Sequence, residues 1–138
     1  MQRPLWIAVG IALIAPSARA DVSSWCLWTQ LHDLHAVATR CAGKVSPEAQ
    51  AGYERLRKAT EAAVLRDAPL HAGASAESAS AEMAQYAAKR RPIEPNRCAD
   101  PDLRRAVTIF ETLGSSESMA KLVAELANRR DPYEGDCL

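Results

Sequence analysis

The apolar positions of this chain recur at intervals of three and four residues, which is the spacing of one face of an α-helix. Ser23 or Ser24 can cap a first helix, and Gly43 is suited to end it. The apolar stripe of this first predicted helix consists of Leu27, Leu31, Leu34, Ala38 and Cys41. The pattern therefore predicts a helix of about five turns from residue 24 onward.

Ser46-Pro47-Glu48 predicts the start of a second helix, because it places a cap, a proline and an acidic residue in the order that a helix N-terminus favours. This helix should end near Asp67, before Pro69. Residues 70–75 carry no periodic pattern and predict a loop. A third, weaker helix is expected from about Ala76 to Arg90, and Pro92 closes it. Its stripe is mostly small residues and consists of Ala79, Met83, Tyr86 or Ala87, and Arg90.

Residues 93–98 form a proline-containing linker, after which Asp100-Pro101-Asp102 opens a fourth helix that ends at Gly114. Ser115 or Ser116 caps a fifth helix, which stops by Asp131-Pro132. No alternating strand pattern and no internal repeat occurs along the chain. The sequence predicts an all-α fold of four to five short antiparallel helices in a bundle-like array, with residues 131–138 as a C-terminal tail.

The first twenty residues have the order of a secretory signal peptide: Arg3, an apolar run over 5–15, and small residues at Ala18 and Ala20. The run of about eleven residues is too short to span a bilayer, which takes roughly 20. We therefore expect cleavage near Ala20, a single domain over 21–138, and a periplasmic or secreted location.

Charge and composition narrow the classes of partner. The chain carries 17 basic and 17 acidic residues, and loss of Arg3 and Arg19 leaves 15 against 17, a net charge of −2. A near-neutral domain is not attracted to nucleic acid or to an anionic membrane surface. No apolar run downstream is long enough to span a membrane. The domain is expected to be a monomer or a small oligomer.

Four cysteines remain after cleavage, namely Cys26, Cys41, Cys98 and Cys137. An exported protein can pair them as disulfides, whereas a metal site is disfavoured because no C-x-x-C motif occurs. A bridge between Cys26 and Cys41 would require the first helix to break, since fifteen helical residues span about 22 Å. We favour Cys41–Cys98 with Cys26–Cys137, and the alternative is Cys98–Cys137 with Cys26–Cys41.

His32 and His35 are three residues apart on the first predicted helix, so their side chains can approach each other. The pair could hold zinc or copper if another helix or the loop residue His71 supplied a third ligand. The structural interpretation is that His35 is half-buried beside Leu31 and Leu34, while His32 points outward. Three arginine pairs (Arg90-Arg91, Arg104-Arg105 and Arg129-Arg130) also allow a basic surface, although acidic residues accompany them.

Trp25 and Trp28 lie in the first turns of the first helix, together with Leu27. The three side chains cannot all point inward, so one tryptophan should be partly exposed, either under Tyr133 and the tail or at a partner's surface. Tryptophan is enriched among the residues that dominate binding energy at protein interfaces. Trp25 and Trp28 are therefore the candidate protein-binding residues.

No catalytic motif is present, and pairing all four cysteines would leave no reactive thiolate. No motif for attaching a cofactor is found, and we expect the protein to have no cofactor. We therefore predict a non-enzymatic exported protein that acts by binding another protein, in an inhibitory, immunity or chaperone-like role. The alternative is a periplasmic carrier of a metal ion or small ligand that uses His32 and His35.

Overall fold

The computed structural model describes residues 22–135 and 137, and within them it contains five α-helices and two 3₁₀ turns. The helices are α2 (Ser24–Cys41), α3 (Pro47–Asp67), α4 (Ala76–Ala88), α5 (Pro101–Thr112) and α6 (Ser116–Glu125). The predicted signal peptide lies outside the described residues. The all-α prediction is confirmed, because no strand occurs in the described part of the chain.

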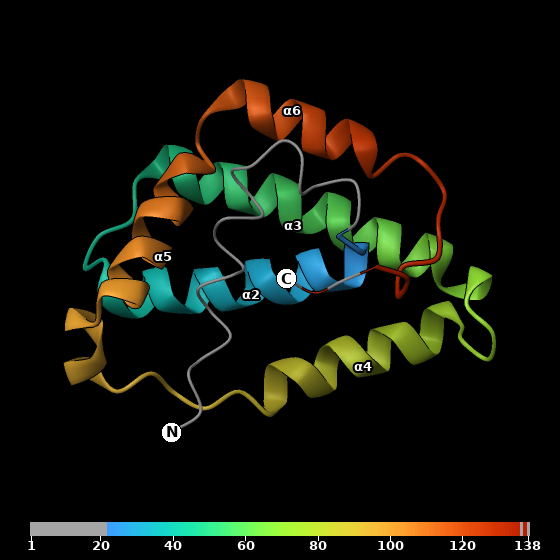
Figure 1. Cartoon of the computed structure of the whole chain (residues 1–138), viewed down its shortest axis with the longest axis horizontal. Coiled ribbons are helices and arrows are strands. Elements are labelled where there is room, and N and C mark those ends of the chain that lie inside the picture. Colours follow the sequence, from blue (N-terminus) through green and yellow to red (C-terminus); the bar gives the residue numbers. More distant parts are fainter. Residues whose placement is uncertain (1–21, 136, 138) are drawn as a thin grey trace.

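Helices α2 and α3 form an antiparallel pair, around which the other helices are arranged (Figure 1). In this view α6 lies along α3, and α4 runs along the opposite side of the molecule. Helix α5 differs from the others, because it runs steeply across the end of the α2–α3 pair. Within the described part of the chain, no helix combines the length and apolar character that a membrane span would need.

Three predicted helix starts are built as the sequence indicates. The Ser23 hydroxyl accepts a hydrogen bond from the Cys26 backbone N–H at 3.1 Å, and Ser46 does the same for Ala49 at 3.1 Å. The Asp100 carboxylate accepts from the Asp102 N–H at 3.0 Å. The predicted loop and linker are more ordered than expected, since each borders or contains a 3₁₀ turn, Ala68–Leu70 and Pro95–Ala99.

The main cluster of buried apolar side chains lies between α2, α3 and α5, with Met119 of α6 at its edge. Leu31, Leu56 and Phe110 are completely buried at its centre. The backbones also approach closely here, because a Cβ atom added at Gly52 would collide with the carbonyl group of Leu113. A glycine at this point of α3 therefore allows the end of α5 to pack against the helix.

A smaller side cluster lies between the first half of α2, the end of α3, and α4. Its buried members are Trp28, Val64, Ala68, Ala79 and Met83. Only two α4 residues, Ala79 and Met83, are buried, so α4 covers the cluster with a narrow stripe. Trp25, Leu65 and Tyr86 pack against the side cluster and are partly exposed.

Each end of α2 is joined to a distant part of the chain by a disulfide. Cys26 pairs with Cys137, with Cα atoms 5.2 Å apart, and Cys41 pairs with Cys98 at 5.3 Å. This is the pairing that the sequence favoured. The reasoning holds because α2 is unbroken from Ser24 to Cys41, which keeps Cys26 and Cys41 at opposite ends. Two disulfides indicate an oxidising, exported environment.

Candidate protein-binding surface

The structure separates the two candidate tryptophans by their burial. Trp28 is 7% exposed and belongs to the side cluster, together with Met83 of α4. Trp25 is only half-buried, and Leu27 points into the main cluster. One partly exposed tryptophan was therefore the correct expectation, and the exposed one is Trp25.

Six ring side chains, which we call the aromatic cluster, form a continuous series of contacts. They are His71, Tyr133, Trp25, Trp28, His32 and Tyr86. Trp25 stacks on Trp28 with centroids 5.6 Å apart, and Trp28 stacks on His32 at 5.4 Å. Such pairs contribute about 0.5–1.5 kcal/mol each beyond their buried area. The cluster is thus a rigid aromatic layer along the first half of α2.

The C-terminal tail holds one end of the aromatic cluster in place. The Trp25 backbone N–H donates to the Pro132 carbonyl at 3.1 Å, and the Tyr133 ring lies 5.6 Å from that of Trp25. Asp131 accepts from the Tyr133 N–H at 2.9 Å, and its other oxygen lies 2.9 Å from Nδ1 of His71. With the nearby Cys26–Cys137 disulfide, these bonds fix the tail against the aromatic rings.

A partly buried polar network closes the other end of the aromatic cluster. The Tyr86 hydroxyl donates to Asp33 at 2.8 Å, and the Arg90 guanidinium donates to the second Asp33 oxygen at 2.5 Å. Burial raises the pKa of Tyr86, and the hydrogen bond to Asp33 acts in the same direction. The network ties α4 to α2, so the position of Tyr86 does not depend on apolar contacts alone.

His32 and His35 occupy different environments, although both are half-buried. His32 contacts Trp28 and Tyr86, so the expectation that it points outward is wrong. His35 stacks on Tyr53 with centroids 4.2 Å apart and nearly parallel rings. Burial is the main cause that lowers the pKa of each histidine. Both side chains thus serve as ring surfaces in the packing of α2.

The described residues offer no ready metal centre. Within 22–135 and 137, no three histidine, cysteine, aspartate or glutamate side chains gather closely enough to hold an ion. The side chain of His71 lies beside Asp131 and contacts Tyr133, and both of these partners belong to the C-terminal tail. A metal-carrier role for His32 and His35 would therefore require a further metal-coordinating group from outside these residues.

The arginine pairs do not form one continuous basic surface. Arg40, Arg90 and Arg91 line an open groove between α2 and the end of α4, together with His35. Arg90 forms an ion pair with Asp33, and Arg40 donates to the Ile93 carbonyl at 3.2 Å. Arg129 lies elsewhere, 3.5 Å from Asp67. Much of this positive charge is thus used to connect segments of the fold.

Trp25 and Trp28 were predicted as site residues from the sequence, but the neighbouring positions of Tyr86 and His71 were not. Tyr86 had a helical-stripe position, which indicated burial without naming a partner. His71 lies in a stretch with no periodicity, so only the fold reveals its contact with Tyr133. The one available signal was Tyr133 itself, which lies close in sequence to a cysteine that was expected to pair near Trp25.

Comparison with known proteins adds no functional information: no protein-family model, no curated protein and no solved structure matches this chain.

Proposed function

We propose that this protein is exported and acts without catalysis, by binding another protein through the exposed edge of the aromatic cluster. The observation that carries the proposal is the partly exposed Trp25, held between Trp28 and Tyr133. Tryptophan and tyrosine dominate the energetic centres of protein interfaces. Their fixed position here reduces the ordering cost that a flexible binding residue would incur.

In this proposal, the protein is exported before it binds its partner. The N-terminal segment 1–20 would direct the chain to the periplasm or the medium, where the cysteines oxidise. Formation of the Cys26–Cys137 bridge then brings the tail onto Trp25, and the binding surface is complete only in the oxidised protein. The binding surface would therefore form only in the oxidising compartment, where the partner would also be present.

The test is affinity capture by the purified, oxidised protein from the exported fraction of its own cells, followed by quantitative mass spectrometry. The parent protein is compared with Trp25→Ala and with Leu70→Ala. Leu70 is a suitable control because it is a large apolar side chain that is 50% exposed outside the aromatic cluster. A protein captured by the parent and by Leu70→Ala, but lost with Trp25→Ala, is the expected result.

The interaction is then measured with the identified partner. We expect Trp25→Ala to raise the dissociation constant at least tenfold, which corresponds to about 1.4 kcal/mol. Far-ultraviolet circular dichroism establishes that the variant is folded. Equal binding by all three proteins, or no enriched protein at all, would overturn the proposal.

A further inference from the structure

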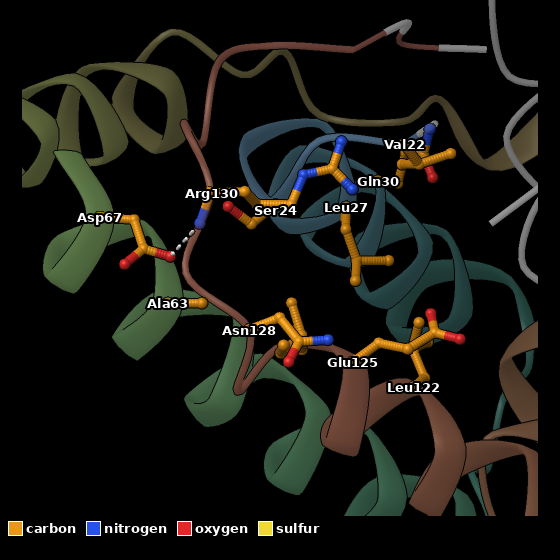
Figure 2. Close-up of a pocket in the computed structure, with 11 residues that line it drawn as sticks. Val22, Ser24, Leu27, Gln30, Ala63, Asp67, Leu122, Glu125, Asn128 and Arg130 are labelled. Atoms are coloured by element: carbon orange, nitrogen blue, oxygen red, sulfur yellow. Dashed lines mark hydrogen bonds between the residues drawn. The ribbon is translucent and has the colours of Figure 1, made fainter. Parts of the chain in front are cut away.

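An open groove lies between the second half of α2 and the segment that follows α4. Its volume is about 590 Å³, within the range of about 300–1,000 Å³ that is usual for small-molecule sites. The cavity between α2, α3 and α6 that Figure 2 shows is much smaller, at about 60 Å³. Its buried carboxylate, Asp67, already accepts hydrogen bonds from the Arg66 side chain and the Arg130 backbone N–H. The groove therefore offers the room for a ligand that the cavity lacks.

One wall of the groove is the segment 90–98, which is fastened to α2 at three points. These are the Arg90–Asp33 ion pair, the hydrogen bond from Arg40 Nε to the Ile93 carbonyl at 3.2 Å, and the Cys41–Cys98 disulfide. In Figure 1 this segment leaves the end of α4 and follows the second half of α2. Because both walls are joined before any ligand arrives, binding would carry little cost of ordering the protein.

The charged side chains that line the groove are all basic, namely Arg40, Arg90 and Arg91. Arg90 is paired with Asp33. Arg40 donates to a neutral carbonyl, which orients its guanidinium without cancelling its charge. Within the part of the chain that the structure describes, neither Arg40 nor Arg91 forms an ion pair with an acidic side chain. Two positive charges therefore face the groove without an acidic partner.

The surrounding charges reduce this excess but do not remove it. The groove lies near the C-terminal ends of α2 and α4, and a helix dipole places roughly half a negative charge at each such end. Together the two ends offset about one of the two positive charges. Lys89 and Glu94 flank the wall without lining the groove, and their charges are opposite. The remaining charge, about one positive unit, matches a ligand with a single negative charge.

The two unpaired arginines lie close enough to share one anionic group. Arg40 contacts the Ile93 carbonyl, and Arg91 precedes Ile93 by only two residues. Their Cα atoms, those of Arg91 and Ile93, are therefore at most about 8 Å apart, a gap that an arginine side chain can cross. A guanidinium donates two parallel hydrogen bonds to a carboxylate, which makes this anion a good geometric match.

The rest of the groove favours an apolar ligand body. Its apolar lining comes from both walls and consists of Ala36, Ala87, Pro92 and Ile93. All four side chains are at least partly exposed, so a hydrocarbon group laid on them would remove apolar surface from water. The His35 ring also lines the groove, and its stacking on Tyr53 holds it as a flat surface.

We propose that this groove binds a small organic monocarboxylate. Arg40 and Arg91 hold its carboxylate, and its hydrocarbon body lies against Ala36, Ala87 and Ile93. The groove shares no residue with the aromatic cluster, so this site does not rest on the proposed function. Because the arginines are exposed to solvent, salt should weaken the binding.

The experiment is a titration of the purified, oxidised protein with 3-phenylpropanoate at constant ionic strength, followed by ¹H–¹⁵N chemical-shift changes. Saturable shifts centred on residues 35–40 and 87–91 are expected, with a dissociation constant on the order of 1 mM or below. The alcohol 3-phenylpropan-1-ol and the cation 3-phenylpropylammonium have the same body, whereas acetate has the carboxylate alone. Each should bind at least about tenfold more weakly, because each lacks one of the two contacts.

Two results of this titration would overturn the assignment. The absence of saturable shifts at these residues would show that the groove is not a site for this ligand class. Equal binding of the alcohol would show that the arginines do not select a carboxylate. Phenyl phosphate tests the charge, and its binding about tenfold more tightly than 3-phenylpropanoate would contradict a site for a single negative charge.

Substitution of the arginines locates the contact. Arg91→Gln and Arg40→Gln should each weaken 3-phenylpropanoate binding at least about fivefold. Arg40→Lys keeps the charge but not the fork of donors, so its loss should be smaller. Arg105→Gln is the matched control, because it removes the same charge from an exposed position of α5 that does not line the groove. Circular dichroism establishes that each variant is folded. An equal loss with Arg105→Gln, or parent affinity with Arg91→Gln, would contradict the proposal.

Discussion

The main and side clusters share α2 but are built differently. In the main cluster, residues from α2, α3 and α5 surround Phe110, and backbone atoms meet at Gly52. In the side cluster, a thin α4 stripe covers Trp28, and Trp25 and Tyr86 remain partly exposed. One face of α2 therefore packs into the main cluster along its length, from Leu27 to Ala38. A second face, in the first half of the helix, holds aromatic rings that stay partly exposed.

Removal of the disulfides is expected to have the largest effect on stability and to distinguish the two ends of α2. The bridges close 57 and 111 residues, for which the chain-entropy relation gives about 4 and about 5 kcal/mol. Cys41→Ala with Cys98→Ala should therefore lower the free energy of unfolding nearly as much as Cys26→Ala with Cys137→Ala. Urea denaturation of both double variants measures the two losses.

The two double variants should differ locally. Without Cys26–Cys137 the tail is held on Trp25 by few bonds, so the tryptophan emission should shift to longer wavelength in the absence of urea. The double variant that lacks the Cys41–Cys98 bridge keeps Cys26–Cys137, so its tail stays on Trp25. Its tryptophan emission spectrum should therefore match that of the parent. Identical native spectra for all three proteins would show that the disulfide does not maintain the aromatic cluster.

Truncation of one large side chain in each cluster gives the next largest effect. Phe110 is completely buried among three helices, so Phe110→Ala should cost about 3–5 kcal/mol. Met83→Ala in the side cluster should cost about 2 kcal/mol, because α4 is attached by few buried residues and can move into the space. Thermal unfolding measures both. A loss for Met83→Ala equal to that for Phe110→Ala would contradict the difference between the clusters.

The fold could be predicted largely from local signals. Ser23, Ser46 and Asp100 cap helices as their positions indicate, and the spacing of Cys26 and Cys41 disfavoured a bridge between them. These features depend on residues close in sequence. The steep crossing of α5 and the close approach at Gly52 could not be predicted, because they depend on which helix faces meet.

The candidate site could be predicted only in part. Leu27 and the two tryptophans compete for the same inward direction, which correctly indicated that one tryptophan is partly exposed. The contact of His32 with Tyr86 was missed because Tyr86 lies more than fifty residues away in sequence, whereas the contact with Trp28 lies one turn away on the same helix.

Substitution of Gly52 tests the backbone contact that distinguishes the main cluster. Gly52→Ala places a methyl group against the Leu113 carbonyl, so α3 and α5 must separate, and the cost should be about 1–3 kcal/mol despite the higher helix propensity of alanine. The neighbouring exposed residue provides the control, and Ala51→Ser should change stability by less than about 0.5 kcal/mol. Stabilisation by Gly52→Ala would show that the helices are not in contact at this point.

The smallest expected effect is a dependence of stability on pH that arises from His35, whose ring contacts Tyr53 and Phe110 of the main cluster. Burial is the main cause that lowers the pKa of His35 in the folded state, and the charges of Arg57 and Arg90 lower it further. Glu54 and a hydrogen bond with Gln50 act in the opposite direction. The unfolded chain therefore binds the proton more readily than the folded protein. His35 imposes no penalty well above its unfolded pKa of about 6.5, and stability decreases as the pH falls through this value.

The contribution of His35 is isolated by measuring the unfolding midpoint between pH 7.5 and pH 5. His35→Gln keeps a planar side chain but removes the titration, so its midpoint should fall less over this range than that of the parent.

Asp67 also has a lowered pKa, but because it is a carboxyl group its effect is lost only below about pH 4. His32→Gln should flatten the profile in the same direction, because burial also lowers the pKa of His32. If both variants reproduce the parent profile, the stacked histidines do not resist protonation, and the contact between His35 and Tyr53 tolerates a charged ring.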